Sequence, residues 1–219
     1  MSTTGDPALM AKLLTSTRLR SYVDATRGDL PAALRLYDWN TVVSAAVLAT
    51  VAMVEVIVRN SMDTQLTRWA SARGERSWLD ALPLEPRGVD DLDRAQRAVE
   101  ARGVCVDYHD HVVAELNLGF WRYLAAQRYL TSLWVPALGK AFPHGYRDVR
   151  ERRRAVERHL TSLAIVRNRV AHHEPVHRRD LCGDLRAGVE LATWVHPEAG
   201  AWVASRSPLE AVIARRPHC

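Results

Sequence analysis

The strongest restriction on the fold comes from an uncharged stretch of sixteen residues between Asp38 and Glu55. It contains the run VVSAAVLATVAMV, and charged residues resume at once with Glu55 and Arg59. The stretch is shorter than the roughly 20 apolar residues that a bilayer-spanning helix needs, and Ala, Ser and Thr dilute its hydrophobicity. It therefore predicts a buried core helix and argues against a membrane anchor.

Helical patterns continue along nearly the whole chain, and no segment of strand length alternates between apolar and polar residues. Asp6-Pro7 has the form of an N-cap followed by a first helical position, and Ser16 or Thr17 is expected to cap the next helix. The further expected helices cover 30 to about 72, 90–101, 108–133 with an interruption near 118–119, 146–172 and 180–195, with short ones after Pro197 and Pro208. The segment 74–88 holds two prolines and two glycines and is expected to be a surface loop. The prediction is an all-α chain forming a single domain over 1–219.

Composition places this domain among ordinary soluble proteins. A chain of 219 residues with 47% hydrophobic and 25% charged residues can bury a sizeable core. The cysteines Cys105, Cys182 and Cys219 are odd in number, widely spaced and free of metal-ligand spacing, which fits a reducing compartment. The N-terminus lacks the basic start and long apolar centre of a signal peptide. We therefore expect a cytoplasmic protein without a membrane partner.

The positive charge is concentrated in one region. The net charge is +5, and residues 147–186 alone hold eleven Arg against six Asp or Glu, while the rest of the chain balances at nineteen of each sign. Such a cluster favours a polyanionic partner, with nucleic acid as the first candidate. The alternative is a solvated helix face in a chain that uses 28 Arg and only 2 Lys.

A candidate chemical site lies inside this basic region, in the run Arg167-Asn168-Arg169-Val170-Ala171-His172-His173-Glu174-Pro175. Asn168 and His172 are four residues apart and share a helix face, and Arg167 lies on its flank. Pro175 disfavours helical angles at Glu174, so the helix is expected to end near His172 or His173. The negative end of the helix dipole would favour the protonated imidazole of His172. In phosphoryl chemistry the guanidinium of Arg167 could bind the anionic phosphate, and the imidazolium of His172 could act as the acid.

The same run contains a pattern that suggests a different chemistry. His173-Glu174-Pro175-Val176-His177 matches the H-E-x-x-H signature of zinc proteases. That signature needs a helix to bring its two imidazoles to one metal, and an interior proline breaks a helix. No obvious third ligand follows, so we expect neither a metal nor another cofactor.

A second polar group interrupts the long apolar helix at Glu55, Arg59 and Asn60. Glu55 and Arg59 are four apart in the favourable order for a helical ion pair. They are either a pair that fixes packing or a brace for Arg167 and His172.

Four ordered blocks resemble a known family. They are Leu36-Tyr37-Asp38-Trp39-Asn40, Glu55-x-x-x-Arg59-Asn60, the segment from Glu115 to Trp121, and the segment from Arg167 to Pro175. With these blocks, with Trp202 and with the Arg216-Pro217 ending, the chain resembles the Abi-like (abortive infection) proteins of the HEPN superfamily.

The resemblance implies a HEPN-like helical bundle with extra N- and C-terminal helices, and a homodimer in which two Arg/His motifs meet in one cleft. Active members are metal-independent endoribonucleases. In that chemistry His172 would move protons, Arg167 would stabilise the transition state, and Asn168 would orient His172 or the phosphate. The supporting residues would be Glu55, Arg59, Asn60 and His173, and the RNA contacts would be Arg169, Arg178 and Arg179.

Two functions remain open at the level of sequence. One is an endoribonuclease of phage defence or of a toxin–antitoxin pair, with RNA as substrate and a cognate antitoxin or regulator as partner. The other is a noncatalytic module that binds RNA, a nucleotide or a protein, because some superfamily members have lost catalysis.

Overall fold

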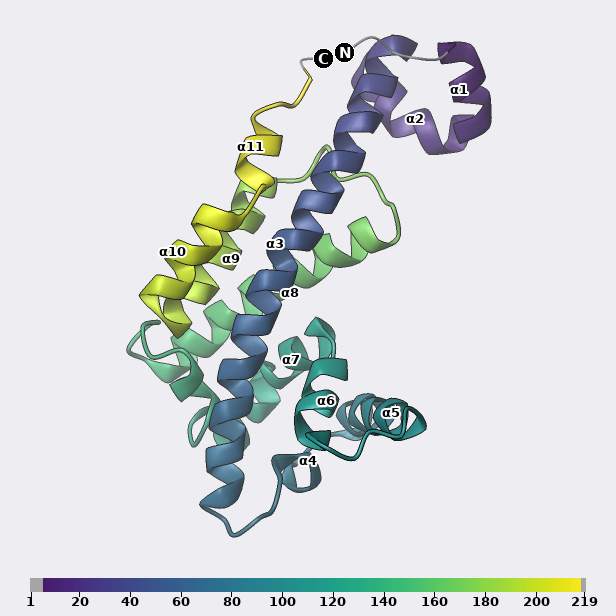
Figure 1. The fold of residues 1–219 in the computed structure, drawn as a ribbon. Coiled ribbons are helices and arrows are strands. Elements are labelled where there is room, and N and C mark those ends of the chain that lie inside the picture. Colours follow the sequence, from purple (N-terminus) through teal and green to yellow (C-terminus); the bar gives the residue numbers. More distant parts are fainter. Residues whose placement is uncertain (1–5, 218–219) are drawn as a thin grey trace. The chain divides into compact units, whose positions relative to one another are not determined.

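The computed structural model describes residues 6–217, which form helices and turns with no strand among them (Figure 1). This confirms the all-α prediction. The α-helices are α1 Pro7–Leu14, α2 Ser16–Ala25, α3 Leu30–Ser71, α4 Trp78–Ala81, α5 Pro86–Ala101, α6 Tyr108–Glu115, α7 Leu118–Leu124, α8 Val149–Ala171, α9 Leu181–Val195, α10 Pro197–Arg206 and α11 Leu209–Ile213. Three short helical turns lie between α7 and α8, at η1 Gln127–Tyr129, η2 Leu130–Trp134 and η3 Leu138–Ala141.

Local capping residues set the first helix ends. The carboxylate of Asp6 accepts a hydrogen bond from the backbone N–H of Ala8 at 3.0 Å, and Pro7 occupies the first helical position, as expected. The cap of α2 is Thr15, one residue before the expected Ser16 or Thr17, and its hydroxyl accepts from the N–H of Arg18. Thr15 has a φ of +70° and a ψ of 149°, a conformation that is rare for a β-branched residue.

The expectation of a surface loop over 74–88 is wrong for much of that segment. It contains α4 and the first turn of α5, and the side chain of Trp78 is fully buried. The indole N–H of Trp78 donates to the Asp63 carboxylate at 2.7 Å, and Ser77 caps the short helix. Tertiary packing of one large aromatic ring thus overrides the turn-forming composition. The break between α6 and α7 falls at Leu116 and Asn117, just before the expected position.

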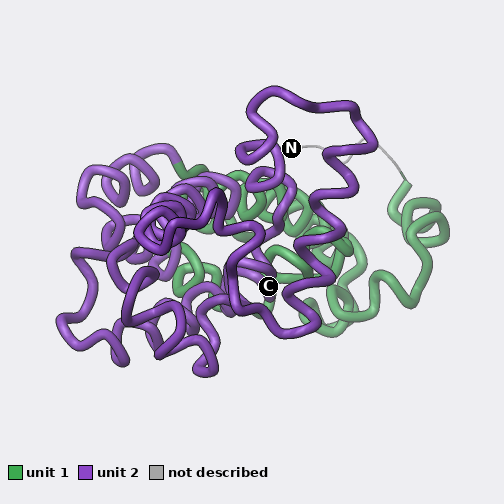
Figure 2. The backbone as a smooth tube through the Cα atoms, turned by 90° about the horizontal axis from the view of Figure 1, so that it is seen from below, with its two compact units in different colours: residues 1–50, 166–185, 207–219 green, residues 51–165, 186–206 purple. Residues whose placement is uncertain are grey.

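Two compact units divide the chain (Figure 2). Unit 1 comprises residues 1–50, 166–185 and 207–219, and unit 2 comprises residues 51–165 and 186–206. Helices α3, α8 and α9 each contribute residues to both units. The single domain over 1–219 remains a prediction.

Unit 1 brings its three chain segments together through specific side-chain contacts. The indole N–H of Trp39 donates to the carbonyl of Val212 at 2.9 Å, and the guanidinium of Arg216 lies 5.5 Å from the Trp39 ring centre. The buried amide oxygen of Asn40 accepts from the N–H of Val176 at 2.8 Å. These bonds link positions more than 130 residues apart in sequence.

Unit 2 is built around aromatic side chains. Trp78 packs against Phe120 and Trp121, and Trp134 stacks on Phe142. The buried guanidinium of Arg153 donates to the carbonyl of Ala125 at 2.6 Å and pairs with Glu157. A buried cation of this kind needs such partners, because leaving it unpaired would cost several kcal/mol.

Helix α3 supplies buried side chains to each unit, including Val43 and Val47 in unit 1 and Val54 and Val58 in unit 2. Among the described residues it is the one helix with the length and hydropathy of a membrane span, a test that soluble core helices also pass. Only 39% of its most apolar stretch is buried. The free cysteines Cys105 and Cys182 are exposed, and Cys219 lies outside the described residues.

Candidate functional site

The Arg/His motif, which comprises Arg167, Asn168 and His172, lies where α8 ends. The backbone there forms a Schellman turn. The N–H of His173 donates to the carbonyl of Val170 at 3.1 Å, and the N–H of Glu174 donates to the carbonyl of Arg169 at 2.7 Å. His173 has a φ of +57°, the left-handed conformation that this turn requires and that glycine most often supplies. His172 is therefore the last residue before the chain reverses. The predicted helix end near His172 or His173 is confirmed.

The last turn of α8 exposes all three expected catalytic residues. The side chains of Arg167, Asn168 and His172 face solvent, and the guanidinium of Arg167 donates to the amide oxygen of Asn168 at 3.4 Å. The backbone N–H of His172 donates to the carbonyl of Asn168 at 3.0 Å, which stacks the two residues one helical turn apart. A cation, an amide and an imidazole thus lie together on an open helix end.

The H-E-x-x-H segment does not form a helix. α8 ends at Ala171, so residues 173–177 have no regular helical geometry. His173 is exposed, whereas His177 is 1% exposed and its ring lies 4.8 Å from that of Tyr22. The predicted disruption of this helix at Pro175 is confirmed.

Burial governs the chemistry of His177. Desolvation, together with the positive charges of Arg178 and Arg216, lowers the pKa of His177 to about 4. The Nε2 atom of His177 lies 3.3 Å from the Ser21 hydroxyl, while its Nδ1 atom has no hydrogen-bond partner among the described residues. His177 is therefore a neutral residue that joins the loop between α8 and α9, residues 172–180 and called the motif loop below, to α2.

The three arginines expected to contact RNA lie in the same unit, but two of them are engaged internally. Arg169 donates to the carbonyl of Pro175 at 2.9 Å and pairs with Glu174, and so closes the turn after α8. Arg179 holds the buried carboxylate of Asp184 with two hydrogen bonds of 2.5 and 2.7 Å. Arg178 is exposed and has one contact, of 3.4 Å, with the carbonyl of Ser21. RNA binding by these three residues remains a prediction.

The expected supporting residues Glu55, Arg59 and Asn60 belong to unit 2, whereas the motif belongs to unit 1. The Arg59 guanidinium donates to the amide oxygen of Asn60 and to the carbonyl of Ala114, both at 3.4 Å. Within the described part of the chain these are its contacts, in place of the expected ion pair with Glu55. The role of this group as a brace for the motif remains a prediction.

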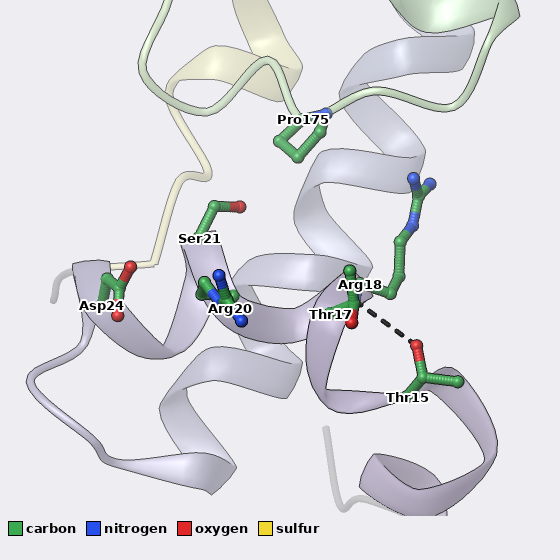
Figure 3. Close-up of a pocket in the computed structure, with 7 residues that line it drawn as sticks. All are labelled: Thr15, Thr17, Arg18, Arg20, Ser21, Asp24 and Pro175. Carbon is green, nitrogen blue, oxygen red and sulfur yellow. Dashed lines mark hydrogen bonds between the residues drawn. The ribbon is translucent and has the colours of Figure 1, made fainter.

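A surface pocket that the sequence did not indicate lies along α2 in unit 1 (Figure 3). Its volume is about 470 Å³, and Pro175 of the motif loop forms part of its wall. The remaining lining residues are Thr15, Thr17, Arg18, Arg20, Ser21 and Asp24. Arg178 donates a hydrogen bond to the Ser21 carbonyl, and a second hydrogen bond joins the His177 Nε2 atom and the Ser21 hydroxyl, so both residues link the loop after α8 to this helix. In sequence, α2 resembles any solvated helix, so no local pattern signalled the pocket.

No group of three or more His, Cys, Asp or Glu side chains suited to a metal ion occurs within residues 6–217. Comparison of the chain with protein-family models, with curated proteins and with solved structures finds no match. The residues at the end of α8 and the surface around them are therefore the features that indicate a function.

Proposed function

We propose that the protein is a metal-independent endoribonuclease whose catalytic residues are Arg167, Asn168 and His172. The observation that carries the proposal is the joint exposure of these three side chains on the last turn of α8. A buried or internally paired motif would instead serve packing, as Arg153 does in unit 2. The surplus of arginine over residues 147–186 supports a polyanionic substrate.

The chemistry fits transfer of a phosphodiester within the RNA chain. His172 accepts the proton of a ribose 2′-hydroxyl as its oxygen attacks the adjacent phosphorus, and the bond from phosphorus to the 5′-oxygen breaks. A protonated imidazole returns a proton to the departing 5′-oxygen. The products are a 2′,3′-cyclic phosphate and a 5′-hydroxyl. Arg167 stabilises the negative charge on the phosphorane-like transition state, and Asn168 orients either the phosphate or the imidazole.

A homodimer would supply a second imidazole for this reaction. Ile165 and Asn168 on α8 and His172 just after its end are spaced i, i+3 and i+7 in sequence, and the side chain of Ile165 is 46% exposed. On α3, an exposed row of small and apolar side chains recurs at alternating three- and four-residue intervals, at Val42, Ala45, Ala49, Ala52 and Val56. Such rows suit close pairing of helices between two copies.

The biological setting belongs to the same proposal. A cytoplasmic ribonuclease of prokaryotic phage defence or of a toxin–antitoxin pair would be held in check by a cognate antitoxin or regulator. A noncatalytic module that only binds RNA, a nucleotide or a protein is the alternative, and the cleavage experiment separates the two.

The test uses the purified full-length protein with total RNA in excess EDTA. We expect fragments with 2′,3′-cyclic phosphate and 5′-hydroxyl ends. His172→Ala and Arg167→Ala should each reduce the cleavage rate by about 100-fold or more, with helical content and thermal melting unchanged. Suitable controls are His111→Ala on α6 and Arg154→Ala on α8, which remove an exposed imidazole and an exposed guanidinium that do not belong to the motif. Wild-type cleavage by His172→Ala would overturn the catalytic assignment, and binding without cleavage by the wild type would establish the alternative.

A further inference from the structure

The pocket along α2 is lined by two arginines whose guanidinium groups have no ion-pair partner among the described residues. Arg18 and Arg20 both line it, and neither side chain makes an ion pair or hydrogen bond with another described residue. Other arginines of the unit, such as Arg169 and Arg179, are paired with carboxylates. An unpaired guanidinium in a concave surface is suited to a bidentate contact with a phosphate.

The other lining groups restrict the class of ligand that the pocket can bind. Thr17, Arg20, Ser21 and Asp24 follow the i, i+3, i+4, i+7 spacing of one helix face, so hydroxyl, cationic and anionic groups share one side of α2. Asp24 accepts hydrogen bonds but repels a free phosphate ion. A nucleotide matches both properties, because its phosphate meets the arginines while an amino group of its base can donate to Asp24. The volume of about 470 Å³ is within the range of small-ligand pockets, roughly 300–1,000 Å³.

The pocket is tied to the motif loop within the same unit. Pro175 lies three residues after His172 in sequence and lies over the pocket in Figure 3, where Arg18 extends beside it. The Ser21 carbonyl accepts from Arg178, and the Ser21 hydroxyl meets the buried His177. These contacts hold the loop against α2, so a chain that passes over the loop meets both the motif and the pocket.

We propose that this pocket binds one nucleotide of the RNA that flanks the scissile phosphate, with Arg18 and Arg20 on its phosphate and Asp24 on an amino group of its base. The inference rests on the proposed ribonuclease function for the identity of the polymer. Arg18 and Arg20 are binding residues and take no part in the proton transfers at His172.

The test measures binding of a pool of short single-stranded RNAs whose 2′-hydroxyls are methylated, so that they cannot be cleaved. Fluorescence anisotropy at several salt concentrations gives both the affinity and its salt dependence. The double variant Arg18→Ala/Arg20→Ala should bind about tenfold more weakly, and the slope of log K against log salt should fall by about 0.7, the value for one lost phosphate contact on a single strand. Arg35→Ala, which removes an exposed arginine of the same unit outside the pocket, should change neither.

Two further measurements separate the possible outcomes. Arg20→Glu reverses one exposed charge with little risk to folding and should weaken binding at least as much as the alanine change at that site. RNA that carries 4-thiouridine should crosslink to residues 15–24 or to the loop at Pro175. Free nucleoside monophosphate should compete at millimolar concentration, and inorganic phosphate should not.

Wild-type affinity and salt slope in both arginine variants would overturn the pocket assignment, even if the protein cleaves RNA. Crosslinks confined to other segments would do the same. Weakened binding in these variants, together with unchanged cleavage by His172→Ala, would leave the pocket in place and overturn the proposed catalytic site instead.

Discussion

At the scale of single residues, His177 links the stability of unit 1 to pH. Its pKa is lowered to about 4 in the folded chain, mainly by burial, whereas an unfolded histidine titrates near 6.5. Between these values the unfolded chain binds the additional proton, so the stabilisation is complete above about pH 6.5 and is lost as the pH falls towards 4. We expect a loss of about 3 kcal/mol from this residue over that window.

The measurement is urea denaturation of the wild type and of His177→Phe at pH values from 7 to 4. Phenylalanine keeps a ring against Tyr22 and removes the titrating group. The free energy of unfolding of the wild type should fall relative to that of His177→Phe as the pH falls, because only the wild type must be protonated on unfolding. Parallel pH profiles would show that His177 does not titrate over this window.

At the scale of one element, the end of α8 is held by a residue in an unfavourable conformation. His173 occupies the left-handed position of the Schellman turn, where glycine has no steric penalty. His173→Gly should therefore raise the free energy of unfolding by about 0.5–1 kcal/mol, as measured by chemical denaturation. His173→Val is the matched opposite, since a β-branched side chain at positive φ should destabilise the protein. Equal stability of the two variants would contradict this account of the turn.

At the scale of the whole molecule, the proposed active site is composite, because it takes one His172 from each of two subunits. We expect these subunits to pair through the exposed row on α3 that runs from Val42 to Val56. Ala49 lies at the centre of that row and its side chain faces solvent, so Ala49→Arg should preserve the fold and block close pairing of two helices. We expect light scattering to show a dimer for the wild type at micromolar concentration and a monomer for this variant, with loss of ribonuclease activity.

Thr67→Arg is the control for that experiment, because it adds the same charge at an exposed position near the end of α3 and outside the row. It should remain dimeric. A wild-type monomer with full ribonuclease activity would reject the composite site while leaving the assignment of His172 intact.

The sequence by itself determined the features that depend on a few neighbouring residues. Asp6 and Pro7 start α1, and Pro175 prevents a helix over the H-E-x-x-H segment, because caps and proline act within about one turn of the chain. The position of the motif at the end of α8 follows from the same local rules. The all-helical class was predictable for a similar reason, since apolar periodicity is also a local property.

Only the tertiary structure decided which polar and aromatic groups would be buried or paired. Trp78 lies in a segment with the composition of a loop and is buried through its bond to Asp63. Arg169 closes a turn, whereas Arg18 lines a pocket and has no ion-pair partner within residues 6–217. Side chains that are tens of residues apart in sequence come into contact only when helices pack. No local sequence pattern predicts which of them will do so. The physical division is therefore between backbone geometry, which is encoded locally, and burial, which is a property of the packed chain.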